Sequence, residues 1–191
     1  MSLISNVKVY GLEDSIKRCK YPMSVKVDTL SDAATDTVKK LGSAPLGSAH
    51  DNFLQGIIVQ FDLTFTIKAW TEAERYHFLD IISSQSTMHR ITKFDLDNSY
   101  IEYVDTRIID IMKEKVLDYN NTEDEAVKKQ KYLEILYSNP CGFKLTAGMT
   151  TNYRALKLIR KQRKDHKLPE WQEFCEWIDT LPMFTELCLY K

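Results

Sequence analysis

Hydrophobic and polar residues alternate most clearly over residues 57–70, IIVQFDLTFTIKAW. Successive side chains of a strand point to opposite faces, so this period of two predicts one long strand with a single buried face. The predicted buried positions are Val59, Phe61, Leu63, Phe65 and Ile67, and the positions on the other face are Gln60, Asp62, Thr64, Thr66 and Lys68.

Helical spacing and capping residues predict helices around this strand. Thr71 and Glu74 match a capping box and predict a helix from about 72 to 87. Thr122 and Glu125 match a second capping box and predict another helix. Further helices are predicted over 12–20, 32–41 between a Ser31 cap and Gly42, 107–117, 152–167 after Thr151, and from Pro169 to the residues before Pro182.

The order of these elements predicts the fold class. Residues 7–10 predict a short strand, whereas residues 143–151 fit either a strand or a loop. One long alternating strand among several helices, without a βαβ rhythm, predicts an α+β fold. Its antiparallel or mixed sheet would have a long central strand packed by helices.

Composition narrows the class of protein. The 191 residues are 43% hydrophobic and 28% charged, which predicts a single domain over 1–191 with a sizeable core. The net charge of −1 provides no global field for nucleic acid or an anionic membrane, and no apolar run reaches membrane-spanning length. The cysteines form no CxxC pair and no zinc-ligand spacing, which predicts reduced thiols in a cytoplasmic protein without a metal site. They are Cys19, Cys141, Cys175 and Cys188.

Three groups of polar residues could carry chemistry. The first is His50-Asp51-Asn52, just before the long strand, and the second is Gln85 with His89 and Arg90. Each fits either a binding site or ordinary polar residues at the end of an element. The third is the basic helix predicted over 152–167, which fits either a solvated face or a phosphate site, because guanidinium groups match phosphate oxygens. Its cations are Arg154, Lys157, Arg160, Lys161, Arg163, Lys164 and Lys167.

The order of these groups resembles the flavin-dependent thymidylate synthases, also called thymidylate synthase-complementing proteins. HDNFLQGIIVQFDLTF (50–65) is similar to the family's H-E-S-x-L-E-H segment and the strand that follows it. AWTEAERYHFLDIISSQSTMHRI (69–91) is similar to the helix that ends in H-Q-L-x-R-H-R. NYRALKLIRKQRKDHKLPEWQEF (152–174) is similar to N-L-R-x-L-x-x-F-x-x-L-R followed by A-Q-W-E-I-R, and the resemblance spans about 28–181.

The central motif of the family, R-H-R-x-x-S-x-N-E-x-S-x-R, is mostly replaced in this chain. The matching run is MHRITKFDLDNSY (88–100), which keeps only His89 and Arg90. Removing one charged partner from such a site costs on the order of 2–5 kcal/mol. Loss of the two arginines at Met88 and Tyr100 therefore weakens the expected dUMP site, and Lys93 restores a point charge rather than a fork.

The resemblance implies reductive methylation of dUMP with methylenetetrahydrofolate, FAD and NADPH, in a homotetramer without membrane attachment. By the same resemblance, Arg163 is the catalytic residue that binds and activates the nucleotide, and Gln85 and Lys93 contact the substrate. The residues implied to bind the flavin are Asn52, His89, Arg90, Asn152 and Arg154.

Three functions remain open on the sequence. The chain could be a divergent, active synthase, or a flavin- or nucleotide-binding protein of the same fold with altered or lost catalysis. It could instead be a nucleic-acid- or protein-binding module that uses the basic helix 154–167, although the balanced net charge makes nucleic acid the weaker expectation.

Overall fold

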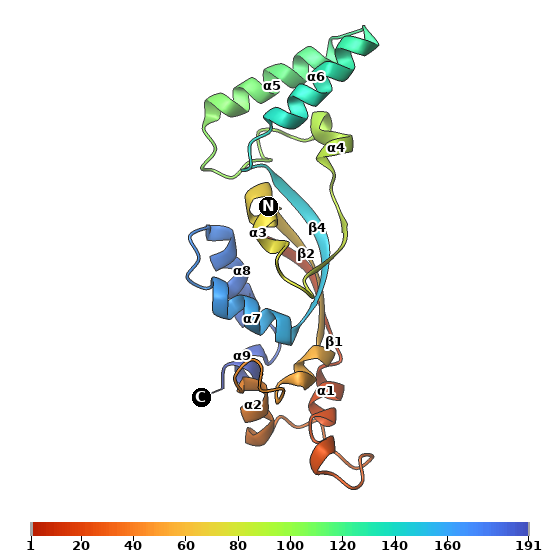
Figure 1. Cartoon of the computed structure of the whole chain (residues 1–191), viewed down its shortest axis with the longest axis vertical. Coiled ribbons are helices and arrows are strands. Elements are labelled where there is room, and N and C mark those ends of the chain that lie inside the picture. The colour runs from red at the N-terminus through yellow and green to blue at the C-terminus, as the bar shows by residue number, and fades with distance from the viewer. Residues whose placement is uncertain (1, 191) are drawn as a thin grey trace. The chain divides into compact units, whose positions relative to one another are not determined.

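The computed structural model describes residues 2–190, in which a four-stranded sheet is combined with helices (Figure 1). β1 runs antiparallel to β2, pairing Ile4 with Leu63 and Tyr10 with Ile58, and the register shifts between Ser5 and Lys8. β2 has a neighbouring strand on each side, so the predicted α+β fold with a long central strand is confirmed. The order across the sheet is β1 (Ile4–Tyr10), β2 (Ile58–Thr66), β4 (Lys144–Asn152) and β3 (Asp80–Ser84).

The chain divides into two compact units. Unit 1 comprises Met1–Leu63, Ala73–Ser83 and Gly148–Lys191, and unit 2 comprises Thr64–Glu72 and Ser84–Ala147. β2, β3 and β4 each contain residues of both units, so the chain crosses between the units within elements of secondary structure rather than through linkers. The single domain expected over residues 1–191 stays a prediction.

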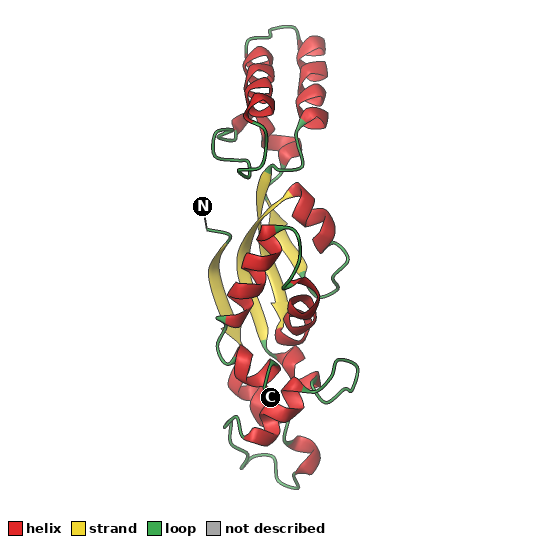
Figure 2. Cartoon of the chain, turned by 90° about the vertical axis from the view of Figure 1, so that its left-hand side faces the viewer, coloured by secondary structure: helices red, strands yellow, loops and turns green. Residues whose placement is uncertain are grey.

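Unit 1 is built around the first part of β2. Val59, Phe61 and Leu63 are buried, as the alternation predicts. The Phe61 ring lies 5.9 Å from that of Phe174 and 4.7 Å from that of Trp177 on α8, and α7 and α8 cover the same side of the strands (Figure 2). The helices of this unit are α1 (Leu12–Arg18), η1 (Tyr21–Met23), α2 (Asp36–Ser43), η2 (Asn52–Gly56), α7 (Tyr153–Arg163), α8 (Pro169–Asp179) and α9 (Phe184–Cys188).

Unit 2 has its own apolar core. Its longest helices, α5 (Thr106–Asn120) and α6 (Glu125–Ser138), lie side by side in both views (Figures 1 and 2). Its shorter helices are α3 (Ile67–Ala73, except the last residue), α4 (Thr87–Arg90) and η3 (Ile91–Lys93). The buried core residues are Ile91, Leu96, Tyr100, Met112, Ile135 and Phe143.

The helix predicted over 72–87 is wrong. The Thr66 hydroxyl accepts a hydrogen bond from the Ala69 amide at 3.1 Å, so a helix begins directly after β2 and ends at Ala73. Thr71 lies inside that helix, where its hydroxyl donates back to the Lys68 carbonyl at 2.8 Å. Residues 80–84 form β3 instead, in keeping with the strand preference of β-branched side chains such as those of its two isoleucines.

Other helix ends differ from the prediction by a few residues. The basic helix is capped by Asn152 rather than Thr151, and α6 by Asp124 rather than Thr122. α2 begins after Thr35 rather than Ser31, and Gly42 lies within it, where a Cβ would come within 2.3 Å of the Leu187 carbonyl oxygen. The glycine therefore permits close packing against α9 rather than ending the helix. The helices of residues 2–190 are too short or too polar to cross a membrane.

Candidate functional site

A pocket of about 370 Å³ lies in unit 1 at the junction of β4 and α7. Two predicted flavin residues, Asn152 and Arg154, line it. The Asn152 side chain also caps α7, accepting a hydrogen bond from the Ala155 amide at 3.0 Å. The remaining lining residues are Leu46, Gly47, Gln55, Arg75, Tyr76, His77, Phe78, Ala155 and Leu158.

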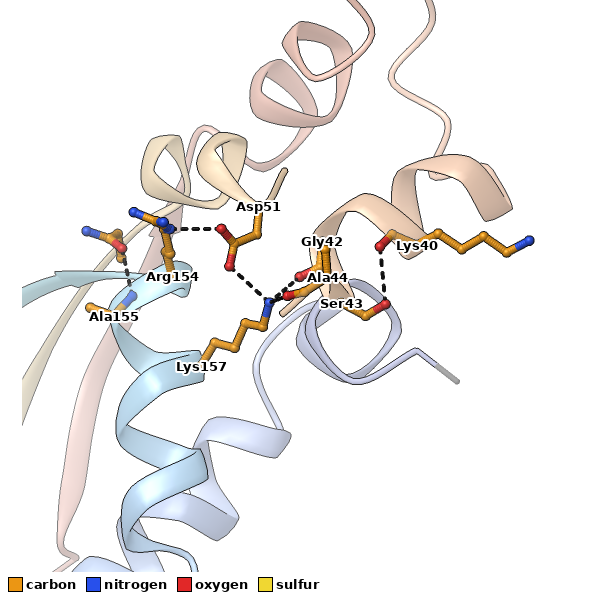
Figure 3. Close-up of polar contacts among 9 residues, drawn as sticks. Lys40, Gly42, Ser43, Ala44, Asp51, Arg154, Ala155 and Lys157 are labelled. Atoms are coloured by element: carbon orange, nitrogen blue, oxygen red, sulfur yellow. Dashed lines mark hydrogen bonds and ion pairs between the residues drawn. The ribbon is translucent and has the colours of Figure 1, made fainter. Parts of the chain in front are cut away.

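A buried carboxylate fixes the basic helix beside this pocket (Figure 3). Asp51 is fully buried, and its two oxygens accept from Arg154 Nε at 2.9 Å and from Lys157 Nζ at 3.0 Å. Lys157 Nζ also donates to the carbonyls of Gly42 at 2.8 Å and Ala44 at 2.6 Å. The network explains how Asp51 and Lys157 can both be buried, because each charge has partners of opposite sign or backbone carbonyls.

Arg163, the predicted catalytic arginine, is only 6% exposed and does not line the pocket. Its Nε donates to the Tyr76 hydroxyl at 2.6 Å, and its guanidinium lies 4.9 Å from the centre of a Trp171 ring. The Tyr76 hydroxyl in turn donates to Gln162 at 3.1 Å. Arg163 therefore supports a wall of the pocket through Tyr76, and its predicted contact with a nucleotide stays a prediction.

The segment 75–78 completes the pocket, and sequence reasoning missed it. Arg75 and His77 are exposed pocket-lining residues that the predicted long helix would have placed mid-helix. Phe78 has a left-handed backbone with φ of 66° and is 65% exposed, both unusual for a large aromatic residue. Its carbonyl accepts from the Thr151 hydroxyl at 2.6 Å. One signal in the sequence could have revealed it: Thr66 can cap a helix that begins directly after the long strand and so ends before residue 75.

The run that resembles the family's central motif lies in unit 2. Leu96 and Tyr100 are buried in the core of that unit, and the Tyr100 hydroxyl donates to Asn139 at 3.0 Å. Burial raises the pKa of Tyr100 to about 12, so the phenol stays neutral. Two of the motif positions that are replaced in this chain are thus part of the apolar core, whereas Met88, a third, is exposed.

A groove of about 580 Å³ in unit 2 collects the other predicted basic residues. His89, Arg90 and Lys93 line it, all exposed. Burial and the neighbouring Tyr119 raise the pKa of Tyr132, against the opposing charge of Arg90. The other lining residues are Met88, Thr92, Tyr119, Glu125, Lys128, Lys129 and Tyr132.

Two predicted contacts lie in neither hollow. Asn52 is exposed at the start of η2. Gln85 is held in unit 2, where its side chain accepts from the Thr146 amide at 2.9 Å and its own amide donates to the Thr146 carbonyl at 2.9 Å. The structure thus brings Asn152 and Arg154 together in one unit and His89, Arg90 and Lys93 together in the other.

Neither thiols nor metal ligands add reactive groups to these hollows. The four cysteines are free, and burial raises the pKa of Cys188 to about 12 and that of Cys175 to about 11. Both therefore remain protonated at neutral pH. Within residues 2–190, no three His, Cys, Asp or Glu side chains cluster so that they could hold a metal ion.

Comparison with known proteins gives the fold a name. The sequence matches no family model and no curated protein. The structure, however, matches a flavin-dependent thymidylate synthase, ThyX from Helicobacter pylori, in complex with FAD and dUMP, with a TM-score of 0.70 over 97% of this chain and 96% of that chain. The fold is that of a flavin-dependent thymidylate synthase. A second structure of Helicobacter pylori ThyX with FAD and dUMP gives the same TM-score over 95% of each chain. Sequence identity to ThyX is 14% in both cases, so the likeness establishes the fold alone.

Proposed function

We propose that this protein is a divergent member of the flavin-dependent thymidylate synthase family that binds FAD and a dUMP-like nucleotide in the unit 1 pocket. The observation that carries the proposal is this pocket, in which Asn152 and Arg154 meet Arg75 and His77. The known structures of the same fold hold FAD and dUMP.

The donors of the pocket suit such ligands. Only Nε of Arg154 is hydrogen-bonded within residues 2–190, so the two terminal amines of its guanidinium remain to donate to phosphate or to a ring carbonyl. Arg75 forms no ion pair within the same residues and adds a second guanidinium. Leu46, Phe78 and Leu158 provide apolar surface for a flat ring.

The position of Arg75 and His77 supports their role. By the resemblance, the helix that comes after the long strand ends in the basic motif. Here that helix ends at Ala73, and Arg75 and His77 follow directly. We therefore propose that they take the place of that motif, whereas the sequence resemblance assigns it to His89 and Arg90, an assignment that stays a prediction.

Retained thymidylate synthesis is a second candidate, favoured by the grouping of Asn152 and Arg154 with two further basic residues in one pocket. Bound reduced flavin would supply the hydride, with NADPH as its reductant and methylenetetrahydrofolate as the one-carbon donor. The replaced positions Met88, Leu96 and Tyr100 weigh against full activity, so ligand binding is the primary proposal. We also propose that the protein is a homotetramer, as the resemblance implies, and light scattering after gel filtration tests this.

The first experiment is the visible spectrum of the purified protein, with melting curves recorded with and without FAD and then dUMP. A ligand at a hundred times its Kd stabilises the folded state by about 2.7 kcal/mol, a clear shift in melting temperature. A colourless protein that neither ligand stabilises would contradict the proposal.

Two matched variants then locate the site. Arg75→Gln and Arg90→Gln each remove one exposed arginine that forms no ion pair within residues 2–190. We expect the first to weaken FAD or dUMP binding about tenfold, the usual size of a lost charged hydrogen bond, and the second to leave it unchanged. Weaker binding in Arg90→Gln with unchanged binding in Arg75→Gln would favour the sequence prediction that His89 and Arg90 bind the flavin. NADPH oxidation that depends on dUMP and methylenetetrahydrofolate, with dTMP as product, tests the second candidate.

A further inference from the structure

The groove of unit 2 gathers four permanent cations on three neighbouring segments. Arg90 ends α4, Lys93 ends η3, and Lys128 and Lys129 lie in the first turns of α6. Glu125 is the one carboxylate among the lining residues. The groove therefore has a strong local positive charge in a chain whose net charge is only −1.

These four cations lack ion-pair partners, unlike most others of unit 2. Within residues 2–190, none of the four forms an ion pair with a carboxylate. Outside the groove, by contrast, Lys115 pairs with Glu134 at 3.5 Å and Lys131 with Asp118 at 2.7 Å. Lys68, Arg107 and Lys113 are likewise paired, with Glu72, Asp105 and Asp97. Unpaired charge is thus concentrated in the hollow rather than spread over the surface.

Two tyrosines give the groove a fixed wall. The Tyr132 hydroxyl donates to the Met88 carbonyl at 2.9 Å and so ties α6 to α4. The Tyr119 and Tyr132 rings lie 5.4 Å apart, and Lys128 Nζ lies 5.4 Å from the centre of the Tyr119 ring. Aromatic faces beside cations suit a ligand that carries both a flat base and phosphates.

We propose that this groove is a second binding site, separate from the unit 1 pocket, for a nucleoside di- or triphosphate. A single phosphate is satisfied by two or three donors, whereas four unpaired cations match the charge of a polyphosphate chain. The tyrosine rings would hold the base. The proposal does not depend on flavin binding, because all the lining residues belong to unit 2.

Titration calorimetry of the full chain with ADP and ATP, and with AMP and inorganic phosphate as weaker probes, tests the site. The test variant is Lys128→Gln with Lys129→Gln. The matched control is Lys113→Gln with Lys115→Gln, which removes two charges from the same helix pair outside the groove. We expect the test variant to lose at least about tenfold in ATP affinity and the control to change less than about twofold. Glu125→Gln should strengthen ATP binding, because it removes the only carboxylate of the lining.

Four outcomes would overturn the proposal. Wild-type protein that binds neither ADP nor ATP has no such site, and equal losses in both double variants indicate diffuse attraction by surface charge. A short oligothymidylate that binds more tightly than ATP, with a steeper salt dependence, indicates a nucleic-acid surface instead. Loss of FAD binding in the test variant would make the groove part of the flavin site. Loss of FAD binding in Arg75→Gln alone leaves this proposal intact, so the two proposals fail separately.

Discussion

The buried network of unit 1 and the groove of unit 2 use positive charge in opposite ways. In unit 1, Arg154, Lys157 and Arg163 all contact buried or half-buried partners, and Lys157 is only 9% exposed. In unit 2, Arg90 and Lys128 line an open groove and form no ion pair within residues 2–190. Charge that is already paired holds the architecture in place, whereas unpaired charge in a hollow is available to a ligand. The same basic residue types therefore carry different roles, and burial and partners distinguish them.

Breaking the buried network of unit 1 should have the largest effect. Asp51→Ala leaves Lys157 buried without a carboxylate and removes the Nε partner of Arg154. Losing one partner of a buried ion pair costs about 3–5 kcal/mol. We expect a corresponding drop in the free energy of unfolding, measured by urea titration.

Asp118→Ala is the matched control for that variant. Asp118 pairs with Lys131 on the surface of unit 2, with its side chain 63% exposed. Exposed pairs contribute little, so we expect a loss of at most about 1 kcal/mol. Equal losses of stability in Asp51→Ala and Asp118→Ala would mean that the buried network contributes no more to stability than an exposed ion pair.

The next largest effect should come from Arg163. Arg163→Lys keeps the charge but loses the Nε donor to Tyr76 and the contact of the guanidinium with the Trp171 ring. We expect a loss of about 1–3 kcal/mol in the free energy of unfolding, the range for a charged hydrogen bond with a cation–π contact.

Tyr76→Phe distinguishes two roles of Arg163, support of the pocket wall through Tyr76 and direct contact with a ligand. It removes the hydroxyl that Arg163 contacts but keeps the ring that lines the pocket. If Arg163 acts through Tyr76, the two variants should lower stability together, and in a double-mutant cycle their effects should not add. Additive effects on stability, with nucleotide affinity lost only in Arg163→Lys, would instead favour the direct contact predicted from the sequence.

The fold was predictable where side-chain periodicity dominates. The alternation in β2 correctly marks Val59, Phe61, Leu63 and Phe65 as buried. The helical spacing of apolar residues misled the prediction after the strand. Tyr76, Leu79 and Ile82 have that spacing, but only the first two are buried. Helical and extended chains can both satisfy a short apolar pattern, and local contacts decide between them. Here the Thr66 cap starts the helix early, and the left-handed Phe78 allows a strand to follow.

The candidate site was predictable only in part for the same reason. The helix that carries Asn152 and Arg154 lies where the sequence predicts it, so both residues could be placed, whereas Arg75 and His77 were hidden inside a helix that does not form. The paired state of Asp51 could not be read from the sequence either. Its partners Arg154 and Lys157 lie about a hundred residues away, and only the fold brings them together.

A smaller effect is expected at Phe78, whose backbone conformation is costly for any residue with a Cβ. Phe78→Gly removes that strain, whereas Phe78→Ala retains it, and both remove the exposed ring. The left-handed conformation costs roughly 1–2 kcal/mol in non-glycine residues. We expect the glycine variant to be the more stable of the two by about 1 kcal/mol in urea titrations.

The same pair of variants tests whether the ring serves the unit 1 pocket. If the ring contacts a bound flavin or nucleotide, both variants lose affinity although the glycine variant folds well. Unchanged affinity in both would mean that the strained position serves only to end one element and start the next.

The smallest change in stability should follow removal of the groove cations of unit 2. Neither Lys128 nor Lys129 forms an ion pair within residues 2–190, so Lys128→Gln with Lys129→Gln removes their mutual repulsion and only the exposed cation–π contact of Lys128 with Tyr119. Such surface changes stay within about 0.5 kcal/mol, and here the melting temperature should stay constant or rise slightly. Raising the salt concentration should reduce any gain, because screening already weakens the repulsion in the wild type. A clear loss of stability would mean that these lysines hold the structure together as Lys157 does, and the distinction between structural and available charge would then fail.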